Sequence, residues 1–285
     1  MLYYYANSGH KIGLERVRRG AALLKRLEAS GVETQLLVND FRAGLAAKDL
    51  GVKEYVTIES IQDIDAIVEA GNSVIIDSPE DDRGRLVKFF SDFKNVWRFE
   101  HDSADSSIHG ETLLRAGCKD DNCVEAVIID DIYFEDHAKK EERTLFFLSD
   151  ADYDKVILSN ESFFKACNME LLLGNYFFVK YEDDLAKLFS TLHEPEEYVD
   201  LVTTSSHIVT SSAQTALEAK ASGAKVVYIH LLNDSLYPVQ ILSAYGINVV
   251  NGFDMELLTK YLNEEEQISE KTIDRFDEDK IKSIL

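Results

Sequence analysis

Short apolar runs recur along this chain and alternate with segments whose apolar residues have helical spacing. In the first half the runs cover residues 2–5, 34–38, 55–58, 73–77, 95–99 and 125–130, and helical patterns cover 13–31, 60–71 and 82–93. Continuous apolar strands that alternate with helices are typical of a parallel sheet covered on both faces. The pattern therefore predicts an α/β fold.

A charged segment, EDHAKKEER at residues 135–143, interrupts this alternation and reads as a linker. After it the apolar runs resume at 144–150, 169–175, 198–205, 208–212, 225–231 and 247–252, with helical patterns at 213–223 and 269–285. We therefore predict two Rossmann-like parallel-sheet domains facing across a cleft. The first covers residues 1–138, and the second covers residues 139–285 and ends in a terminal helix. Ligands of open α/β sheets bind at the carboxyl ends of the strands, so the cleft is the expected site.

The charge balance restricts the partners. The chain has Asp+Glu 52 against Lys+Arg 30, which gives a formal net charge of −22. Such a surface repels nucleic acid and anionic lipid, so we expect neither as a partner. A small anion remains compatible, because the free N–H groups of a helix N-terminus bind phosphate locally.

The cysteines and the first residues indicate a cytoplasmic protein. Three cysteines, Cys118, Cys123 and Cys167, are an odd and sparse set that is not typical of a disulfide framework, and no further Cys or His at metal-binding spacing accompanies the first two. The segment MLYYYANSGHK lacks the features of a secretory leader, and no run of about 18 apolar residues predicts a membrane span. We expect no metal, no cofactor and no insertion into a membrane.

The first strand-to-helix junction, NSGHKIGLERVRR at residues 7–19, carries candidate catalytic groups. Its glycines permit a tight turn that contains His10, and Arg16 and Arg19 share one helix face. A cation near a helix N-terminus is unfavourable unless an anion lies opposite, which favours a role for Arg16. The simpler alternatives are a solvated arginine and a solvated loop histidine.

Two further junctions in the first half also carry polar groups. In VIIDSPEDDRGR, Asp77 ends an apolar strand, although Ser78 or Asp81 could simply cap the next helix. In WRFEHDSADSS, His101 and Asp102 follow a strand and could form an acid–base couple, or could belong to an ordinary polar loop.

The fourth junction, SSHIVTSSAQTALE at residues 205–218, is rich in hydroxyl groups. Small residues such as Ser211 and Ser212 let a ligand approach the backbone, and the helix that follows presents free N–H groups suited to phosphate. Ser212 is also a good helix cap. Capping and phosphate binding are compatible, and Glu218 follows one and a half turns into the helix.

These motifs, in this order, resemble those of the two-domain glycosyltransferase-like proteins with the GT-B fold. The resemblance is greatest to the UDP-sugar hydrolases of bacterial pseudaminic acid synthesis and to spore-coat polysaccharide proteins, and it covers most of the chain. It implies that Ser211, Ser212, Thr215 and Glu218 contact the diphosphate and the uridine ribose. Arg19 matches an arginine of the first motif.

The chain departs from that family at two motifs. The family's first motif is Gly-x-Gly-His-x-x-Arg, which aligns with residues 13–19 of this chain. Its catalytic histidine falls on Arg16, and Glu15 stands in place of its second glycine. The family's glycine-rich loop is replaced by LSDADYD at residues 148–154, whose carboxylates would repel a diphosphate. His10 or His101 would have to take over the acid–base role.

We therefore expect a nucleotide-sugar-binding protein of bacterial surface-glycan or nonulosonic-acid synthesis, a hydrolase or glycosyltransferase that acts on a UDP-sugar-like substrate. The catalytic candidates are His10, Arg16, His101 and Asp102, and the nucleotide-binding candidates are Arg19, Ser211, Ser212, Thr215 and Glu218. One alternative is a non-catalytic GT-B relative that serves as a binding or partner protein. Another is a different α/β enzyme whose ligand is not a nucleotide.

Overall fold

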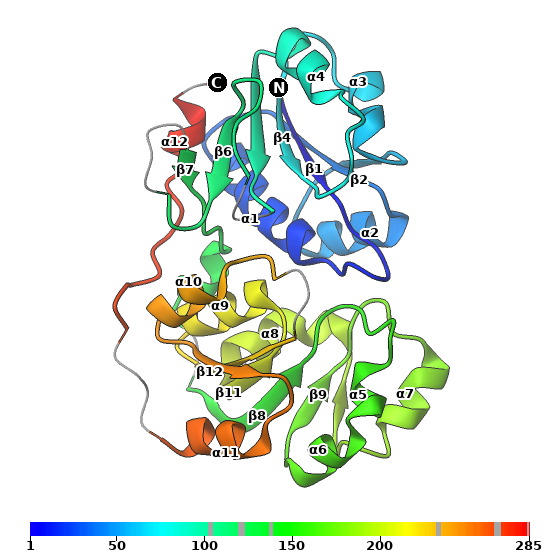
Figure 1. The fold of residues 1–285 in the computed structure, drawn as a ribbon, viewed down its shortest axis with the longest axis vertical. Helices are drawn as coiled ribbons and strands as arrows, with labels where there is room; N and C mark the ends of the chain where they lie inside the picture. Colours follow the sequence, from blue (N-terminus) through cyan, green and yellow to red (C-terminus); the bar gives the residue numbers. More distant parts are fainter. Residues whose placement is uncertain (102–104, 119–122, 137–138, 232–234, 265–268, 284) are drawn as a thin grey trace. The chain divides into compact units, whose positions relative to one another are not determined.

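The computed structural model describes residues 1–101, 105–118, 123–136, 139–231, 235–264, 269–283 and 285 (Figure 1). The chain divides into two compact units. Unit 1 contains Met1–Gly9, Arg16–Asp130 and Arg275–Leu285, and unit 2 contains His10–Glu15 and Asp131–Asp274. The division that we predicted, at residue 138, differs from this one at the short segment before Arg16, at the stretch that begins at Asp131, and at the last residues.

Unit 1 is built on a sheet of seven parallel strands in the order β3-β2-β1-β4-β5-β6-β7. The strands are β1 (Leu2–Ala6), β2 (Thr34–Val38), β3 (Tyr55–Thr57), β4 (Ser73–Asp77), β5 (Asn95–Phe99), β6 (Thr112–Arg115) and β7 (Cys123–Glu125). The helical elements are α1 (Glu15–Ala29), α2 (Phe41–Asp49), η1 (Ile61–Asp63), α3 (Ile64–Ile67), α4 (Leu86–Asp92) and α12 (Asp279–Lys282); the first residue of α1 belongs to unit 2.

Unit 2 has a sheet of six strands in the order β10-β9-β8-β11-β12-β13, again all parallel. The strands are β8 (Glu141–Phe147), β9 (Glu170–Leu172), β10 (Leu192–His193), β11 (Ser205–Thr210), β12 (Lys225–His230) and β13 (Asn248–Asn251). The helical elements are η2 (Asp131–Phe134), α5 (Val156–Ser159), α6 (Glu161–Ala166), α7 (Val179–Leu185), η3 (Pro195–Glu197), α8 (Tyr198–Thr204), α9 (Ala213–Ala221), α10 (Val239–Ala244) and α11 (Met255–Asn263).

Both sheets have the strand order of a Rossmann-like fold, with a switch point where the order reverses. In unit 1 the switch point lies between β1 and β4, and in unit 2 it lies between β8 and β11. Ligands of such sheets bind outside the carboxyl ends of the strands at this point. Asp77 ends β4 and Ser211 follows β11, so both switch points coincide with junctions that the sequence singled out. The predicted α/β class with two parallel sheets is confirmed.

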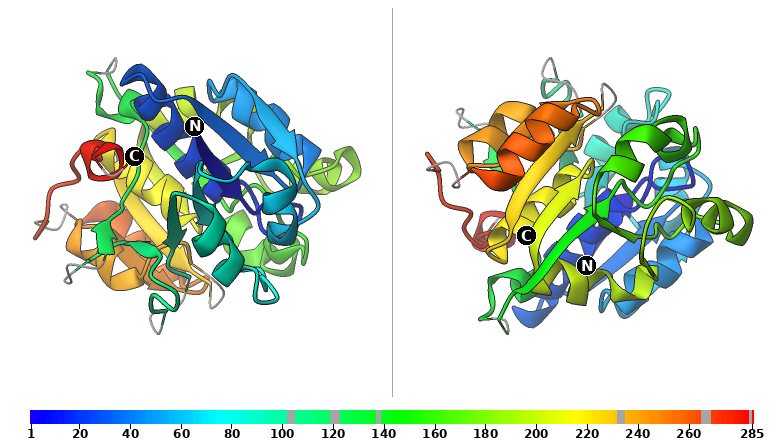
Figure 2. Two further views of the ribbon diagram at one scale, coloured as in Figure 1. Left: turned by 90° about the horizontal axis from the view of Figure 1, so that it is seen from above. Right: turned by 90° about the horizontal axis from the view of Figure 1, so that it is seen from below.

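The continuous apolar strands are buried because helices cover the sheets, as the two views in Figure 2 show for each unit. Every residue of β1 and of β4 is buried. In unit 2, aromatic rings from β8, α6 and the following segments pack together, with Phe146 4.8 Å from Phe164 and Phe164 5.3 Å from Phe189 between ring centroids. Aromatic side chains of this size contribute much of the burial that stabilises a core.

Several predicted elements were wrong. Residues 198–204 form helix α8 and not a strand, because Pro195 opens the turn η3 and the side chains of Glu194 and Glu197 complete a capping box that directs the chain into a helix. The charged segment 135–143 is not all linker, since β8 begins at Glu141. The short strands β6 and β10 were not predicted, and β7 ends where the predicted run at 125–130 begins.

The terminal helix that we predicted over residues 269–285 is helical only at α12 (Asp279–Lys282), among the residues described in that segment. The segment from Arg275 belongs to unit 1, where Phe276 and Ile281 are buried. The Arg26 guanidinium on α1 donates a hydrogen bond to the Phe276 carbonyl oxygen. The last residues are therefore part of the fold of unit 1.

Cys118 and Cys123 form a disulfide between β6 and β7, which we did not predict. The Glu125 carboxylate accepts hydrogen bonds from the backbone N–H groups of Gly117 (2.9 Å) and Cys118 (2.8 Å). These bonds hold Gly117 and Cys118 beside β7, whose first residue is Cys123. Within the described residues, no helix is long and apolar enough to span a membrane.

Candidate functional site

The junction of β11 and α9 forms as a capped helix start. The Ser212 backbone is extended, and its Oγ accepts a hydrogen bond from the Thr215 N–H at 3.1 Å. The Ser212 N–H donates to Thr210 Oγ1 at 3.0 Å, which fixes the turn out of the strand. Both Ser212 and Thr215 are buried. The predicted cap is therefore present at the switch point of unit 2.

A carboxylate occupies the N-terminal end of α9. Ser212 Oγ donates to Glu15 Oε1 at 2.5 Å, and the Gln214 N–H points to the same oxygen at 3.3 Å. The N-terminus of a helix carries partial positive charge and free N–H groups, so a negative side chain is stabilising there. Glu15 comes from the segment His10–Glu15, which belongs to unit 2.

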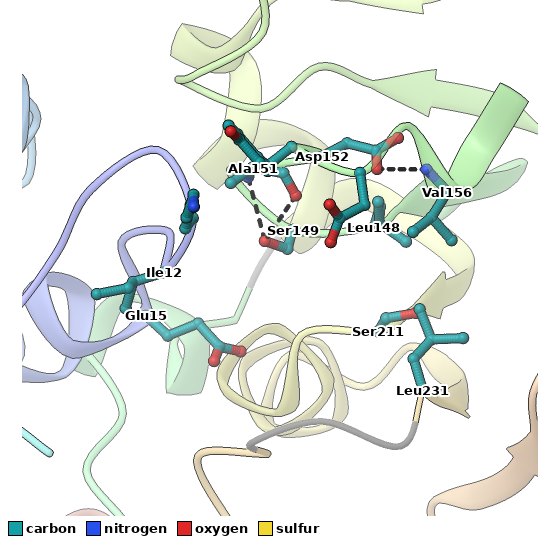
Figure 3. Close-up of a pocket in the computed structure, with 12 residues that line it drawn as sticks. Ile12, Glu15, Leu148, Ser149, Ala151, Asp152, Val156, Ser211 and Leu231 are labelled. Carbon is teal, nitrogen blue, oxygen red and sulfur yellow. Dashed lines mark hydrogen bonds between the residues drawn. The ribbon is translucent and has the colours of Figure 1, made fainter.

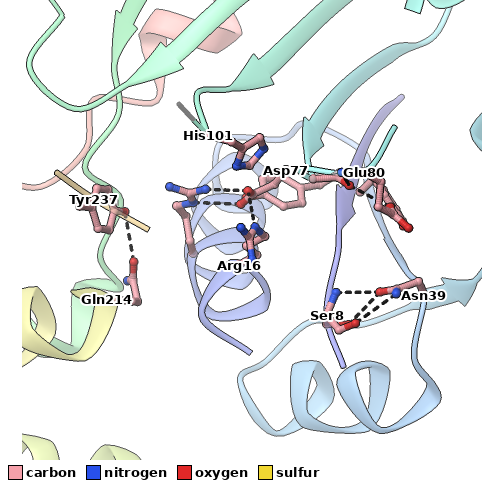
Figure 4. A network of polar contacts seen from close by, with 12 residues as sticks. Ser8, Arg16, Asn39, Asp77, Glu80, His101, Gln214 and Tyr237 are labelled. Carbon is pink, nitrogen blue, oxygen red and sulfur yellow. Dashed lines mark hydrogen bonds and ion pairs between the residues drawn. The ribbon is translucent and has the colours of Figure 1, made fainter. Parts of the chain in front are cut away.

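Glu218, the predicted ribose contact, is buried within a polar network. Its side chain is 2% exposed, and its oxygens accept hydrogen bonds from the Tyr198 hydroxyl (2.6 Å) and from Gln214 Nε2 (2.8 Å). The Tyr237 hydroxyl donates in turn to Gln214 Oε1 at 3.1 Å (Figure 4). The Tyr198 hydroxyl also lies 2.7 Å from Thr215 Oγ1. This network links α8, α9 and the segment before α10.

A cavity of about 330 Å³ lies beside the start of α9 (Figure 3). Its lining comes from the segment 10–15, the ends of β8, β11 and β12, and the residues after β8: Lys11, Ile12, Glu15, Leu148, Ser149, Ala151, Asp152, Tyr153, Asp154, Val156, Ser211 and Leu231. A volume of this order suits a small ligand. Three of the lining residues are acidic and one is basic, so the cavity is acidic overall.

Not all of the acidic groups in the cavity wall are available to a ligand. The Asp152 carboxylate accepts hydrogen bonds from the backbone N–H groups of Val156 (2.6 Å) and Ile157 (3.1 Å) and thereby caps α5. His10 is exposed, and its ring centroid lies 5.4 Å from that of Tyr153. The hydroxyl oxygen of Ser211 is buried and makes no hydrogen bond to the described residues.

A second polar cluster surrounds Asp77 at the carboxyl end of β4 in unit 1 (Figure 4). Asp77 is fully buried and binds the Arg19 guanidinium through both oxygens, with Nε to Oδ2 at 2.9 Å and Nη2 to Oδ1 at 2.6 Å. The Tyr4 hydroxyl donates to Oδ2 at 2.6 Å. Burial alone would raise the pKa of Asp77, but Arg19 and Arg16 hold it below its usual value.

Arg16 and His101 complete this cluster. Arg16 Nε lies 3.5 Å from Asp77 Oδ1, and the Arg16 side chain is 11% exposed. Burial lowers the pKa of His101 to about 4; Asp77 opposes this shift, and the charges of Arg16 and Arg19 add to it. His101 is therefore neutral at neutral pH.

The structure gathers the predicted residues into two groups. Ser211, Ser212, Thr215 and Glu218 lie at the start of α9, and Arg16, Arg19 and His101 surround Asp77. His10 belongs to unit 2, and its ring lies against that of Tyr153. Asp102 lies outside the described residues.

Sequence reasoning missed Glu15, Tyr198, Gln214 and Tyr237 as site residues, and it noted Asp77 without assigning it a role. A glutamate in the first helical turn is common for helix stability alone, so Glu15 gave no separate signal. Tyr198 lies in a segment that was misread as a strand. In the described part of the chain, no three His, Cys, Asp or Glu side chains gather as a metal site would need.

Comparisons of sequence place the chain in no family: no family model matches, and no curated protein matches. Solved structures do match. A spinosyn rhamnosyltransferase complexed with spinosyn aglycone has a TM-score of 0.58 at 12% identity, covering 93% of this chain and 92% of that one. A glycosyltransferase from Rickettsia africae has a TM-score of 0.57 at 9% identity, covering 92% and 86%.

The UDP-GlcNAc 2-epimerase of Methanocaldococcus jannaschii, solved in complex with UDP-GlcNAc and UDP, has a TM-score of 0.56 at 12% identity, covering 93% of this chain and 94% of that one. Identities this low show similarity of fold alone. The likeness establishes a GT-B-like fold with two Rossmann-like domains, as the sequence predicted.

Proposed function

We propose that the protein binds a nucleotide sugar and acts as a hydrolase or glycosyltransferase on a UDP-sugar-like substrate, in bacterial surface-glycan or nonulosonic-acid synthesis. The fold likeness supports the general class, because structures with this fold include nucleotide-sugar enzymes. The finer proposal rests on the sequence resemblance to UDP-sugar hydrolases. The observation that carries it is the Glu15 carboxylate, which occupies the N-terminus of α9.

The Glu15 carboxylate is held by Ser212 Oγ and faces the Gln214 N–H. The same donors suit a phosphate oxygen, because a helix N-terminus binds phosphate through free N–H groups and its partial positive charge. A diphosphate and Glu15 would repel each other if both were present. In this proposal Glu15 leaves the helix end when the diphosphate of the substrate arrives.

The roles of Thr215 and Glu218 follow from their hydrogen bonds. Thr215 supplies the N–H that fixes the Ser212 cap. Glu218 accepts hydrogen bonds from Tyr198 and Gln214 and is only 2% exposed, so a ribose hydroxyl can reach its carboxylate only if neighbouring side chains move. In this proposal Glu218 contacts the ribose in the bound state and holds the network together in the free state.

The catalytic candidates of unit 1 have complementary protonation states. His101 is neutral and can accept a proton, while Arg16 is a permanent cation that can stabilise a leaving group. Arg19 is fully engaged with Asp77 and would position this cluster without contacting substrate. His10 stays a second candidate base, and Asp102 a candidate partner of His101.

A non-catalytic relative is the second candidate, and two observations favour it. Arg16 replaces the histidine that the resembled family uses, and it is ion-paired with Asp77. The residues that replace the glycine-rich loop bring Asp152 and Asp154 to the cavity wall. A protein of this kind would bind a ligand or a partner without turnover.

Calorimetric titration with UDP and UDP-GlcNAc tests the proposal. We expect UDP to bind wild-type protein, and Glu15→Gln to tighten binding about tenfold or more because it removes the competing charge. Glu256→Gln on α11 is the matched control, since Glu256 is exposed and distant in sequence from the junction. Failure of both the wild type and Glu15→Gln to bind any nucleotide would refute the proposal.

Turnover separates the two candidates. Incubation of wild type with UDP-GlcNAc and related UDP-sugars should release UDP or a sugar phosphate, measured by anion-exchange chromatography. His101→Gln should reduce that release by about 100-fold if His101 is the base. Tight UDP binding with no release from any UDP-sugar would favour the non-catalytic relative.

A further inference from the structure

Arg16 carries a buried N–H donor, Nε, that makes no hydrogen bond within the described part of the chain. Its side chain is 11% exposed, and Asp77 is its ion-pair partner, at a distance of 3.5 Å from Nε that is too long for a good hydrogen bond. Leaving a buried charged donor without a partner is destabilising, so such a group calls for an explanation.

The charges around Arg16 do not supply that partner. Asp77 already accepts two hydrogen bonds from Arg19 and one from Tyr4. The other carboxylate that acts on this cluster, Asp105, is ion-paired with Arg98 at 3.1 Å. At the end of β4, the single buried carboxylate of Asp77 is therefore ion-paired with two guanidinium groups.

His101 adds a second unused group on the same side. Its Nε2 atom is buried and makes no hydrogen bond to the described residues. Its backbone N–H donates to the Asp105 carboxylate at 2.8 Å, which fixes the residue just after β5. Figure 4 shows the His101 ring and the Arg16 guanidinium beside Asp77. β4 and β5 are neighbours, so both groups lie at the carboxyl edge of the sheet, where ligands of such folds bind.

We propose that Arg16 and His101 bind the carboxylate of a small acid at this edge of unit 1. A planar carboxylate matches the donor fork of a guanidinium and can accept from the imidazole as well. A monoanion is favoured over phosphate, because Asp77 lies beside the site and repels a dianion about twice as strongly. The carboxylate site uses two side chains of unit 1 to which the proposed function gives catalytic roles, whereas the proposed nucleotide-binding residues at the start of α9 belong to unit 2.

The test uses L-lactate, its neutral amide lactamide, and inorganic phosphate, each at constant ionic strength and pH 7.5. The direct readout is the NMR signal of the His101 ring, identified by its absence from His101→Gln. We expect lactate to shift this signal saturably. Lactamide should leave it unchanged, and phosphate should need about tenfold higher concentration.

Lactate binding by variants of Arg16 tests whether this residue is part of the site. Arg16→Gln should weaken lactate binding about tenfold or more, and Arg16→Lys should retain part of it because the charge remains. Arg42→Gln is the matched control, since Arg42 is an exposed arginine of the same unit, on α2. It should bind lactate as the wild type does.

Three results would overturn the proposal. One is a His101 signal of the wild type that does not shift up to the highest lactate concentration used. Another is equal loss of binding in Arg42→Gln and Arg16→Gln, which would indicate a general charge effect. The third is tighter binding of phosphate than of lactate, which would replace the carboxylate by a phosphoryl group.

Discussion

At the scale of single residues, His101 connects the polar cluster of unit 1 to the stability of the protein. Burial lowers the pKa of its ring from the ordinary value of 6.5 to about 4. Between these two values the unfolded chain binds a proton that the folded protein does not. The contribution of His101 to the unfolding free energy is therefore fully present above about pH 6.5, and it is lost as the pH is lowered towards 4.

We predict that His101→Gln reduces this acid sensitivity. A shift from 6.5 to about 4 corresponds to roughly 3 kcal/mol of unfolding free energy across that window. Urea unfolding of wild type and variant at pH 7.5, 6.0 and 4.5 measures how the unfolding free energy of each protein changes with pH. Parallel slopes for the two proteins would show that His101 is not the titrating group. His109→Gln serves as the control, because His109 is exposed.

Tyr198 offers a second prediction at this scale. Tyr198→Phe removes one of the donors to the buried Glu218 carboxylate, the one that binds Oε2. Since an unsatisfied buried group costs its desolvation, we expect a loss of about 1–3 kcal/mol in chemical unfolding. Tyr153→Phe is the control, because Tyr153 is 57% exposed. Equal stabilities of the two variants would mean that water or another group replaces the Tyr198 hydroxyl at no cost.

At the scale of elements, the two serines at the start of α9 differ in their hydrogen bonds. Ser211 and Ser212 are adjacent, but Ser212 Oγ caps the helix and binds Glu15, whereas Ser211 Oγ has no hydrogen bond in the described structure. Two chemically identical substitutions therefore have different expected effects.

We predict that Ser212→Ala costs about 0.5–2 kcal/mol of stability through the lost cap. Ser211→Ala should change stability by less than about 0.5 kcal/mol. Thermal and urea unfolding measure both. A loss for Ser211→Ala as large as that for Ser212→Ala would indicate that Ser211 also bonds in the folded protein.

At the scale of the whole molecule, the last residues of the chain complete the first unit. Phe276 is 6% exposed and Ile281 is fully buried in unit 1, although both follow unit 2 in sequence. We propose that the two units are the folding domains of the chain. Trp97, the one tryptophan of the sequence, is buried on β5 and reports on unit 1 by fluorescence.

We predict that Phe276→Ala lowers the unfolding free energy seen by Trp97 fluorescence by about 3–5 kcal/mol, as expected for a buried aromatic ring. Phe41→Ala in the same unit should cost less than about 1 kcal/mol, because Phe41 is 61% exposed. If Phe276→Ala left the fluorescence transition unchanged, the terminal segment would not contribute to the stability of unit 1.

The fold class and much of the element order could be predicted from the sequence, because local periodicity decides whether a segment is strand or helix. The sequence also located Ser212 as the cap of α9, since capping depends on residues within one helical turn. The segment 198–205 was misread because its β-branched residues favour a strand, while the turn before it starts a helix.

The contacts between groups that are distant in the sequence could not be predicted in this way. Glu15 reaches Ser212, Tyr198 reaches Glu218, and Arg19 binds Asp77, across separations that no spacing rule covers. These contacts depend on the order of strands in each sheet and on which unit a segment joins. Because that order is set by long-range packing of the whole core, the partners of each polar group follow from the fold and not from the local pattern.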